Sequence, residues 1–574
     1  MITFTIKKNS CFASIILLFV LLVSCSSYKQ FKAPEPPPDD TRNIPQPEEQ
    51  KINIYSEYFN KQITKQIAQS FDLSRQLRNL FGKRKEAKNV DAFGEVINSS
   101  WFTNRNAYKR MSLEEIARGP DKGTGPDTSD VWIITRAKAE GVTPGFTIKD
   151  KQGDNYVVKF DPPGYPELAS GAEVISTKLF YAIGYNVPEN YVTCFHPRIL
   201  KLGENVKFTD KKGRKRNMNN EDLKEILNRI HYLPDGRIRA LASKYIPGRP
   251  IGPFKYKGTR KDDPNDLIPH QYRRELRGLR VISAWLNHFD TKDGNTLDSY
   301  VTEGGVGYVK HFLIDFGATL GSASHGPNHL WRGFKNDIDP HVFSQNLVTL
   351  GFYVHPWEKQ EGVKYHSVGI FESELFSPHK YKPQVPNPAF ENLTNLDGYW
   401  GAKMVISFTD EQLKKVVAEA QYSDPEAEAY IIKTLIKRRD KVGQYYFNKV
   451  IPLDKFELRE TENEKKQLCF VDMAVETGLE SASQVQYRYE LRCDGELILN
   501  TQDLGSKTCL PLPEKRMVKQ NPEGKSGSTY KALVWEFKLQ LKRSAEKKWS
   551  KWVKVYLHSD NSLNKLELIG IRRQ

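Results

Sequence analysis

Two short runs decide the fold of this chain: His288-Phe289-Asp290-Thr291-Lys292-Asp293-Gly294-Asn295, and then Ile314-Asp315-Phe316-Gly317. Between them, residues 297–301 and 307–314 alternate like strands around Glu303-Gly304-Gly305, and paired glycines of this kind mark hairpin turns. Asn295 and Asp315 each lie ten residues from Gly305. A hairpin centred on Gly305 is therefore expected to place these two side chains opposite each other.

A lysine and a glutamate that could form an ion pair lie upstream of these runs. Residues 145–149 and 155–160 alternate like two strands joined by a turn, and the second strand carries Lys159. Apolar residues at helical spacing over residues 169–183 predict a helix with Glu173 in its first turn. We expect Lys159 and Glu173 to form an ion pair.

The H-x-D-x-K-x-x-N pattern, followed by D-F-G, resembles the paired catalytic and metal-binding signature of the protein-kinase-like superfamily. The resemblance covers about residues 136–450 and is closer to divergent members, such as HipA-type kinases and phosphatidylinositol kinases, than to ordinary eukaryotic protein kinases. The chain departs from the common pattern in three places. Residues 141–145 lack a G-x-G-x-x-G loop, Phe289 replaces the usual arginine, and no A-P-E follows Asp315.

Phosphoryl transfer needs one carboxylate near the attacking hydroxyl, and an amide and a second carboxylate that hold Mg²⁺. The resemblance accordingly implies that Asp290 is the catalytic base and that Lys292 lies near the transferred phosphate. It implies that Asn295 and Asp315 are the ligands of the metal ion.

The same resemblance implies that the chain binds a nucleotide, with ATP expected, together with Mg²⁺. Lys159 would contact the phosphates, with Glu173 as its partner, and the hinge between two lobes would lie near residues 243–246.

Two functions stay open at this point. The first is a phosphotransferase, or a nucleotidyl transferase, that acts on an unknown acceptor. The second is a catalytically inactive kinase-like protein that serves as a binding adaptor. The complete set of Asp290, Asn295 and Asp315 favours the enzyme, whereas the missing glycine loop and an address outside the cytoplasm, where ATP is scarce, favour the adaptor.

That address comes from the N-terminus. Lys7 and Lys8 precede an apolar run, residues 11–23, which is too short for a membrane span and typical of a signal peptide. The run ends in Leu22-Val23-Ser24-Cys25, which resembles a bacterial lipobox. We expect residues 1–24 to be the signal peptide and Cys25 to carry lipid, which anchors the protein in the cell envelope. Ser26 favours the outer membrane.

The remaining segments complete the expected organisation. Residues 25–51 are rich in proline and are expected to form an extended or disordered tether. An apolar stripe that begins with Tyr55 and Phe59 predicts a helix at the start of a helical extension over residues 52–135. The two kinase-like lobes are expected over residues 136–250 and 251–450. The histidine-rich residues 322–400 would form a lid or irregular packing.

From residue 451 the apolar period changes to two, and Asp494-Gly495 indicates a hairpin. We therefore expect a β-sandwich over residues 451–574. The predicted fold class is α+β: a two-lobed kinase-like domain, preceded by a helical extension and followed by this β-sandwich. Among the cysteines after Cys25, the pair Cys493–Cys509 is the first candidate for a disulfide.

The net charge is +16, and a basic cluster occupies residues 211–216. In an envelope protein such a charge favours anionic lipid or an anionic polymer as a partner, and no nucleic acid is expected. A solvated hairpin tip would explain the cluster equally well.

Overall fold

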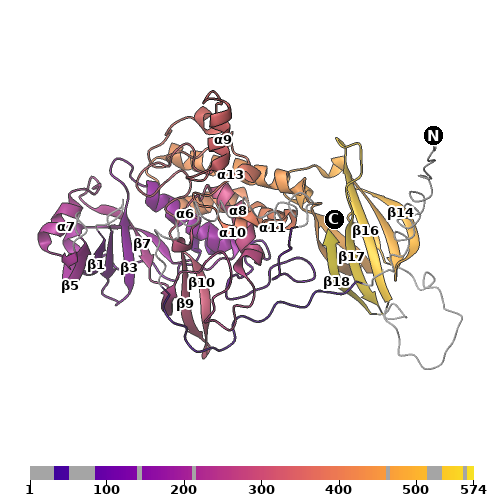
Figure 1. The fold of residues 1–574 in the computed structure, drawn as a ribbon, viewed down its shortest axis with the longest axis horizontal. Coiled ribbons are helices and arrows are strands. Elements are labelled where there is room, and N and C mark those ends of the chain that lie inside the picture. Colours follow the sequence, from indigo (N-terminus) through magenta and orange to yellow (C-terminus); the bar gives the residue numbers. More distant parts are fainter. Residues whose placement is uncertain are drawn as a thin grey trace, which may run out of the picture. The chain divides into compact units, whose positions relative to one another are not determined.

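The computed structural model describes residues 31–50, 84–138, 145–209, 215–460, 466–512, 533–559 and 565–573. The chain divides into two compact units (Figure 1). Unit 1 takes the described residues up to Pro34 together with Leu453–Val471 and residues from Ser481 onward, and unit 2 takes Glu35–Pro452 and Asp472–Glu480. The fold is α+β. The expected signal peptide, Cys25 and the apolar stripe from Tyr55 lie outside the described residues.

Unit 2 contains a mixed seven-stranded sheet in the order β4-β7-β3-β2-β1-β5-β6. All its neighbours pair antiparallel except β1 and β5, which pair parallel. Its strands are β1 Trp132–Lys138, β2 Gly145–Lys149, β3 Asn155–Phe160, β4 Asn190–Phe195, β5 Leu200–Thr209, β6 Lys215–Asn217 and β7 Ile238–Lys244. The core beneath them is built from large apolar side chains, among them Trp132, Phe146, Phe160 and Phe195.

The expected strands 145–149 and 155–160 are β2 and β3. Burial alternates along β3 as predicted, whereas the first four residues of β2 are all buried. Helix α6, Leu168–Ile183, follows β3. Fourteen of its residues are buried, so it lies inside the fold rather than on its surface. A shorter helix, α7 Asn220–Leu227, joins β6 to β7.

After β7 the chain enters a second sheet of three antiparallel strands, in the order β10-β9-β8. These are β8 Arg249–Gly252, β9 Thr296–Glu303 and β10 Val306–Leu313. The predicted hairpin is present, but its centre lies between Gly304 and Gly305, which both adopt positive φ. Asn295 is therefore opposite Ile314, with Ile314 N donating to Asn295 O at 3.1 Å, and Asp315 lies one residue beyond the expected position.

Helices gather on one side of the β9–β10 hairpin (Figure 1). They are α8 Arg274–Leu286, α9 Pro340–Val348, α10 Pro388–Glu391, α11 Asn395–Ile406, α12 Asp410–Ala418, α13 Pro425–Phe447 and α14 Met473–Glu476. The predicted capping box is present, because Thr409 accepts from Gln412 N at the start of α12. The sequence did not identify α11.

The arginines of α8 are not a solvated face. Arg277 is fully buried and its Nη1 lies 2.9 Å from Asp397 Oδ2 of α11, while Arg274 Nε lies 3.0 Å from the other carboxylate oxygen. The side chain of Asp397 is also fully buried and caps α11 through Thr394. One carboxylate thus joins the two helices that form the centre of this lobe.

Residues 52–83 of the expected helical extension lie outside the described residues. Residues 84–131 contain one short helix, α5 Leu113–Arg118, among turns, bends and isolated bridges, and β1 begins at Trp132. Residues 31–50 are extended, as predicted, but they are not a free tether. Ile44 is buried against Ile251 and Val309, and Gln50 N donates to Ile251 O at 2.9 Å. A few apolar side chains are enough to fix a proline-rich segment in place.

Unit 1 is built from two antiparallel sheets, β11-β12-β15 and β14-β13-β16-β17-β18. Its strands are β11 Leu453–Glu460, β12 Lys466–Asp472, β13 Val485–Cys493, β14 Glu496–Gly505, β15 Cys509–Pro511, β16 Leu533–Arg543, β17 Val553–Ser559 and β18 Leu566–Arg573. Asp494 and Gly495 form the predicted hairpin with positive φ. Phe31 completes the unit, because it stacks on Tyr556 with ring centroids 4.1 Å apart.

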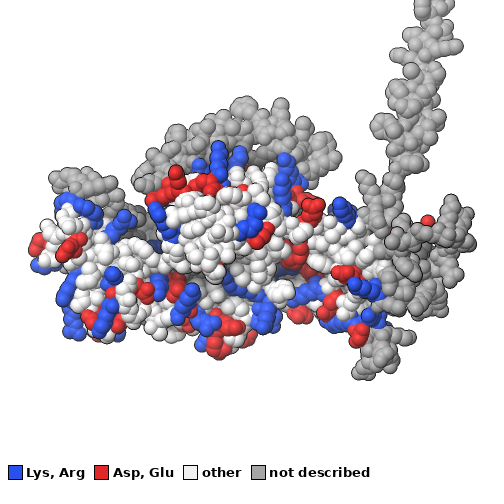
Figure 2. All heavy atoms as spheres, turned by 90° about the horizontal axis from the view of Figure 1, so that it is seen from below, with Lys and Arg blue, Asp and Glu red and all other residues white. Residues whose placement is uncertain are grey.

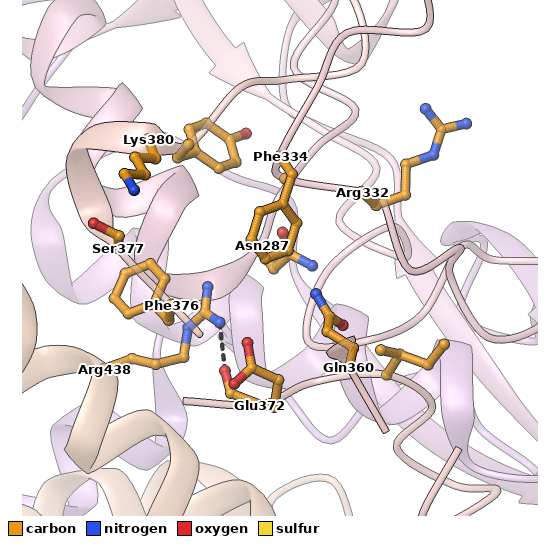
Figure 3. A pocket seen from close by; sticks show the side chains of 12 residues that line it. Asn287, Arg332, Phe334, Gln360, Glu372, Phe376, Ser377, Lys380 and Arg438 are labelled. Carbon is orange, nitrogen blue, oxygen red and sulfur yellow. Dashed lines mark hydrogen bonds between the residues drawn. The ribbon is translucent and has the colours of Figure 1, made fainter. Parts of the chain in front are cut away.

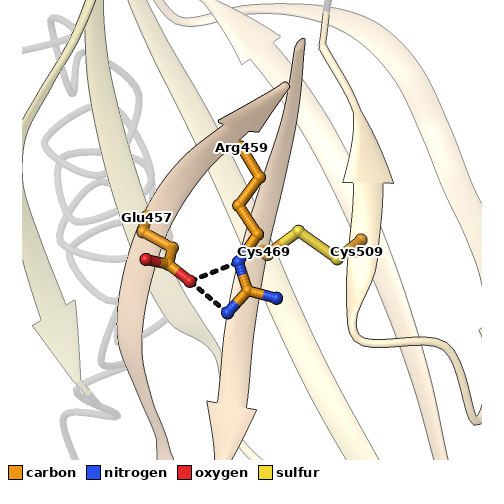
Figure 4. The surroundings of a disulfide bond; sticks show 4 residues. All are labelled: Glu457, Arg459, Cys469 and Cys509. Carbon is orange, nitrogen blue, oxygen red and sulfur yellow. Dashed lines mark hydrogen bonds and ion pairs between the residues drawn. A yellow bond between two sulfur atoms is a disulfide. The ribbon is translucent and has the colours of Figure 1, made fainter. Parts of the chain in front are cut away.

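The disulfide prediction was wrong. Cys469 is bonded to Cys509, and Cys493 is free (Figure 4). The reason is strand pairing: Cys469 and Cys509 face each other across β12 and β15, whereas Cys493 ends β13 in the other sheet.

Among the described residues, no helix is long and apolar enough to cross a membrane. Lys and Arg side chains are interspersed with Asp and Glu on the face of the molecule drawn in Figure 2. The expected basic cluster falls largely on residues that the structure does not describe.

We expect the Cys469–Cys509 bond to stabilise unit 1. It joins positions 40 residues apart, and closing a loop of this kind stabilises a fold by about 2–4 kcal/mol. Cys509→Ser should lower the unfolding midpoint of unit 1 in scanning calorimetry and should make that midpoint insensitive to reductant. Cys493→Ser is the matched control and should change neither. Recovery of a Cys493–Cys509 peptide from a non-reducing digest would contradict the assignment.

We expect Asp397→Ala to destabilise unit 2 by about 3–5 kcal/mol, because it leaves two buried guanidinium groups without their carboxylate. Glu411→Ala, on an exposed position of α12, should change the free energy of unfolding by less than about 0.5 kcal/mol. Denaturant unfolding followed by circular dichroism measures both. Equal effects of the two variants would show that the buried carboxylate has no special role.

Candidate functional site

The first part of the site is an ion triad around Lys159. Lys159 Nζ lies 2.9 Å from Asp315 Oδ1 and 3.2 Å from both carboxylate oxygens of Glu173. The Glu173 side chain is 3% exposed, while those of Lys159 and Asp315 are 32% and 48% exposed. The expected Lys159–Glu173 pair is therefore present, and Asp315 completes it from the solvent side.

Lys159 and Glu173 meet because the segment between β3 and α6 is fixed. Asp161, directly after β3, accepts hydrogen bonds from Ala169 N at 2.9 Å and Ser170 N at 2.8 Å. A carboxylate that satisfies free amides at a helix start stabilises that end of the helix. Asp161 thus ties the first turn of α6, and with it Glu173, to the end of the strand that carries Lys159.

The backbone at Asp315 is unusual. Asp315 has φ +64, a left-handed conformation that non-glycine residues adopt rarely and often at functional sites. Gly317 passes so close to Glu173 that a Cβ there would lie 3.2 Å from Glu173 Oε2 and 2.8 Å from Ser324 Oγ. The glycine of the D-F-G run is therefore favoured by the close approach of Ser324 and, less tightly, of Glu173 on α6.

Phe316 connects this turn to both α6 and the loop that begins at His288. It is fully buried, stacks on Phe180 of α6 with centroids 4.7 Å apart, and contacts His288 at 5.7 Å. Burial lowers the pKa of His288, so its ring is neutral at neutral pH and packs as part of the core.

The second part of the site is the loop that carries Asp290. Lys292 Nζ lies 2.9 Å from Asp290 Oδ2, and Asn295 Nδ2 donates to the same oxygen at 3.1 Å and to Asp290 O at 2.8 Å. Asp290 Oδ1 is buried and has no hydrogen-bond partner among the described residues. One carboxylate oxygen is thus held in place and the other is left to accept a proton from a further group.

The charges of the triad depend on one another. Burial opposes the charge on Lys159, but the carboxylates of Asp315 and Glu173 outweigh it and raise the pKa of the lysine. Burial, aided by the nearby Asp315, raises the pKa of Glu173 in spite of Lys159. The lysine therefore stays protonated and suits an anionic ligand.

Asn295 and Asp315 offer donors of the kind that a magnesium ion prefers. Asn295 uses its amide nitrogen on Asp290, which leaves an amide oxygen, and Asp315 supplies a carboxylate; both are hard oxygen ligands. No group of three or more His, Cys, Asp or Glu that could hold a metal occurs in the described part of the chain. A metal here would accordingly need the phosphates of a nucleotide as further ligands, as Mg²⁺ commonly does.

The loop is supported from residues 322–400, the region expected to be a lid or irregular packing. Arg332 lies over the Phe289 ring at 4.9 Å, Tyr381 Oη donates to His288 O, and Asn387 Nδ2 donates to Thr291 O at 3.2 Å. These contacts fix the loop that carries Asp290 against residues 332–387.

A pocket with about 410 Å³ of empty space, open solvent included, is lined in part by Arg332 and Tyr381 (Figure 3). In the close-up the Arg438 guanidinium points toward its interior, whereas the head of Arg332 points away. Arg438 is held by three carbonyl oxygens, among them Glu372 O at 2.6 Å, and burial lowers its pKa to about 9.

The six expected site residues thus fall into two directly bonded groups, joined by the Ile314 N to Asn295 O hydrogen bond. The cap by Asp161 and the support by Arg332 and Tyr381 were not foreseen. A carboxylate directly after a strand and before a helix was a signal for the cap. No sequence signal pointed to the other two. Residues 141–144, where a glycine loop would lie, are not among the described residues.

No protein-family model and no curated protein matches the chain. Among solved structures, a proinflammatory kinase of Helicobacter pylori, CtkA, is 11% identical to this chain and superposes with a TM-score of 0.29. The match covers 57% of this chain and 99% of the CtkA chain. The Golgi casein kinase with Mn and ADP bound is 12% identical with a TM-score of 0.26, covering 58% and 73%. A further structure of the Golgi casein kinase is 12% identical with a TM-score of 0.25, covering 70% and 90%. All three TM-scores are below 0.5, so nothing about the site is inferred from these structures.

Proposed function

We propose that the chain is a kinase-like phosphotransferase that depends on Mg²⁺ and a nucleotide, with ATP as the expected donor. The observation that carries the proposal is the pair of bonded groups described above. A lysine is held between two carboxylates beside a second aspartate, which has one oxygen fixed and one oxygen unpaired. This arrangement offers a cation for phosphates, oxygen ligands for a metal and a base for an acceptor.

Each side chain has a role that its contacts support. Lys159, positioned by Glu173, binds the phosphates. Asp290 accepts the proton of the acceptor hydroxyl through its unpaired Oδ1, and Asn295 fixes the orientation of that carboxylate. Lys292, 2.9 Å from Asp290, places a positive charge beside the position of the transferred group.

Asp315 and the amide oxygen of Asn295 would hold Mg²⁺. When bound, the ion supplies positive charge that neutralises the phosphates and stabilises the charge developing in phosphoryl transfer. In the present structure Asp315 bonds Lys159 instead, so the binding of a phosphate group is expected to draw the lysine toward the ligand and leave Asp315 for the metal.

We expect variants of the two aspartates to separate binding from turnover. Asp315→Ala removes a metal ligand and should weaken Mg²⁺-dependent nucleotide binding as well as transfer. Asp290→Ala leaves those ligands in place, so binding should survive while the transfer rate falls by about 10²–10⁴-fold, the usual effect of losing a general base. Lys159→Ala should resemble the metal-ligand variant. Calorimetric titration with ATP and Mg²⁺, beside a phosphate-release assay, measures both quantities.

Asp235→Ala is the matched control, since this carboxylate is 50% exposed on a turn outside the site, and it should leave binding and transfer unchanged. If wild type binds no nucleotide with any divalent ion, the enzyme proposal fails and the inactive adaptor takes its place. If binding occurs but Asp315→Ala leaves it intact, the metal assignment alone is wrong.

We also propose that the protein is a lipoprotein of the bacterial cell envelope, anchored through Cys25 and sorted to the outer membrane. The support is the Leu22-Val23-Ser24-Cys25 run behind a short apolar segment and the serine at position 26. An anionic lipid or envelope polymer is the partner that a net charge of +16 favours.

We expect a fatty-acid probe fed to cells to label the wild-type chain and not Cys25→Ala, because the thiol of Cys25 is the attachment point. Cys11→Ala is the control and should be labelled like wild type. Equal labelling of the Cys25→Ala variant would remove the anchor from the proposal.

A further inference from the structure

The most exposed apolar surface in the described part of the chain is a single segment around α9. Its exposed large side chains are Ile338 46%, Phe343 71%, Leu347 65%, Val348 83%, Leu350 81%, Phe352 87%, Tyr353 40% and Val354 56%. Helix α9 has no buried residue at all, and it stands out from the rest of its unit (Figure 1). We call residues 338–354 the apolar protrusion. Contiguous patches of this kind mark contacts with proteins or membranes.

Polar contacts at both ends of the protrusion fix it to the rest of the unit. Asp339 caps α9 by accepting from His341 N at 3.2 Å, and it also pairs with Lys382 at 2.5 Å. At the other end His355 is buried, stacks on Trp357 at 4.2 Å and bonds Asn346 Oδ1 at 2.6 Å. The apolar side chains are therefore held outward by polar contacts at the base.

Charge distinguishes this surface from an ordinary solvated helix. Residues 340–357 contain no Asp, Glu, Lys or Arg. The acidic residues just before them are neutralised, because Asp337 pairs with Arg332 and Asp339 with Lys382. Beyond this stretch the border carries Lys335, Lys359 and Lys364 together with Glu358 and Glu361, and none of the five makes an ion pair among the described residues. An uncharged apolar tip suits the interfacial layer of a bilayer, and the small excess of lysine at its border favours an anionic surface.

Three polar side chains of the protrusion are bonded within it, which favours lipid over a protein partner. Ser344 Oγ donates to His341 O at 2.9 Å, Thr349 Oγ1 donates to Gln345 O at 2.8 Å, and Asn346 bonds His355. Polar groups that enter a bilayer must be satisfied internally, because lipid tails offer no partner. A protein interface would instead use such groups for hydrogen bonds across it, since interfaces carry about one for every 100–200 Å².

We propose that the apolar protrusion inserts into the interfacial layer of an anionic lipid bilayer, with Leu350 and Phe352 at its tip. Each large apolar side chain that leaves water strengthens partition by roughly tenfold or more, so the tip alone supports membrane contact. This contact is separate from lipid on Cys25 and does not depend on the phosphotransferase activity. It would fix the orientation of the kinase-like unit at a membrane surface.

The test places an environment-sensitive fluorescent amino acid at position 352 of the full chain. A second chain carries it at position 108, where Tyr108 is 85% exposed but lies outside the protrusion. Vesicles contain phosphatidylcholine alone or with phosphatidylglycerol, each with and without nitroxide-labelled lipid. The readout is local, so binding of the vesicle through the N-terminal segment does not mimic insertion.

We expect the probe at position 352 to shift to the blue and to be quenched by the nitroxide lipid, more strongly with phosphatidylglycerol than without it. The probe at position 108 should stay in a water-like environment. Leu350→Ser in the labelled chain should weaken the vesicle dependence of the signal by about tenfold or more, without a change in the unfolding midpoint.

Three results would overturn the proposal. The first is an unshifted probe at position 352 on a chain that sediments with vesicles. The second is a shift that rises with protein concentration in the absence of vesicles, which would assign the surface to a second copy. The third is an equal response at positions 352 and 108. Equal signals in both vesicle types would remove the preference for anionic lipid.

Discussion

The ion triad of Lys159, Glu173 and Asp315 is the interaction on which the rest of the site depends. It joins three segments that are far apart in the sequence: a strand of the seven-stranded sheet, helix α6 and the turn after the β9–β10 hairpin. Glu173 is buried almost completely, so its charge is tolerable only beside the lysine. The lysine in turn is kept protonated by the two carboxylates. The lysine thus needs the two carboxylates nearby to keep its charge, and Glu173 needs the lysine.

Close packing fixes the geometry of this triad. The Asp161 cap sets the start of α6, Phe316 fills the space between α6 and His288, and Gly317 permits the chain to pass beside Glu173. Asp315 carries a left-handed backbone that its surroundings must hold in place. A rigid arrangement of this type suits phosphoryl transfer, in which catalysis depends mostly on positioning and on fixed charges.

Buried charge also organises the lobe that carries Asp290. Asp397 holds Arg274 and Arg277 of α8, and α8 ends at Leu286, shortly before Asp290. In the apolar protrusion around α9 the arrangement is reversed. Its polar groups bond to one another within the segment, and its apolar side chains are exposed. The same unit therefore combines an ionic interior with an apolar, uncharged tip.

The sequence by itself determined the local features of this protein. Period-two and helical spacing located β2, β3 and α6, and a glycine pair located the β9–β10 turn. The same patterns predicted the Lys159–Glu173 pair that the structure contains, and motif spacing selected the other four candidate residues. These signals are local, because they follow from backbone geometry within a few residues. Tertiary structure decided what depends on distant partners. Strand pairing placed Cys469 opposite Cys509. The ion pair with Asp397 allows Arg277 to be buried. Asp315 bonds Lys159 because the fold places that lysine and a buried glutamate beside it.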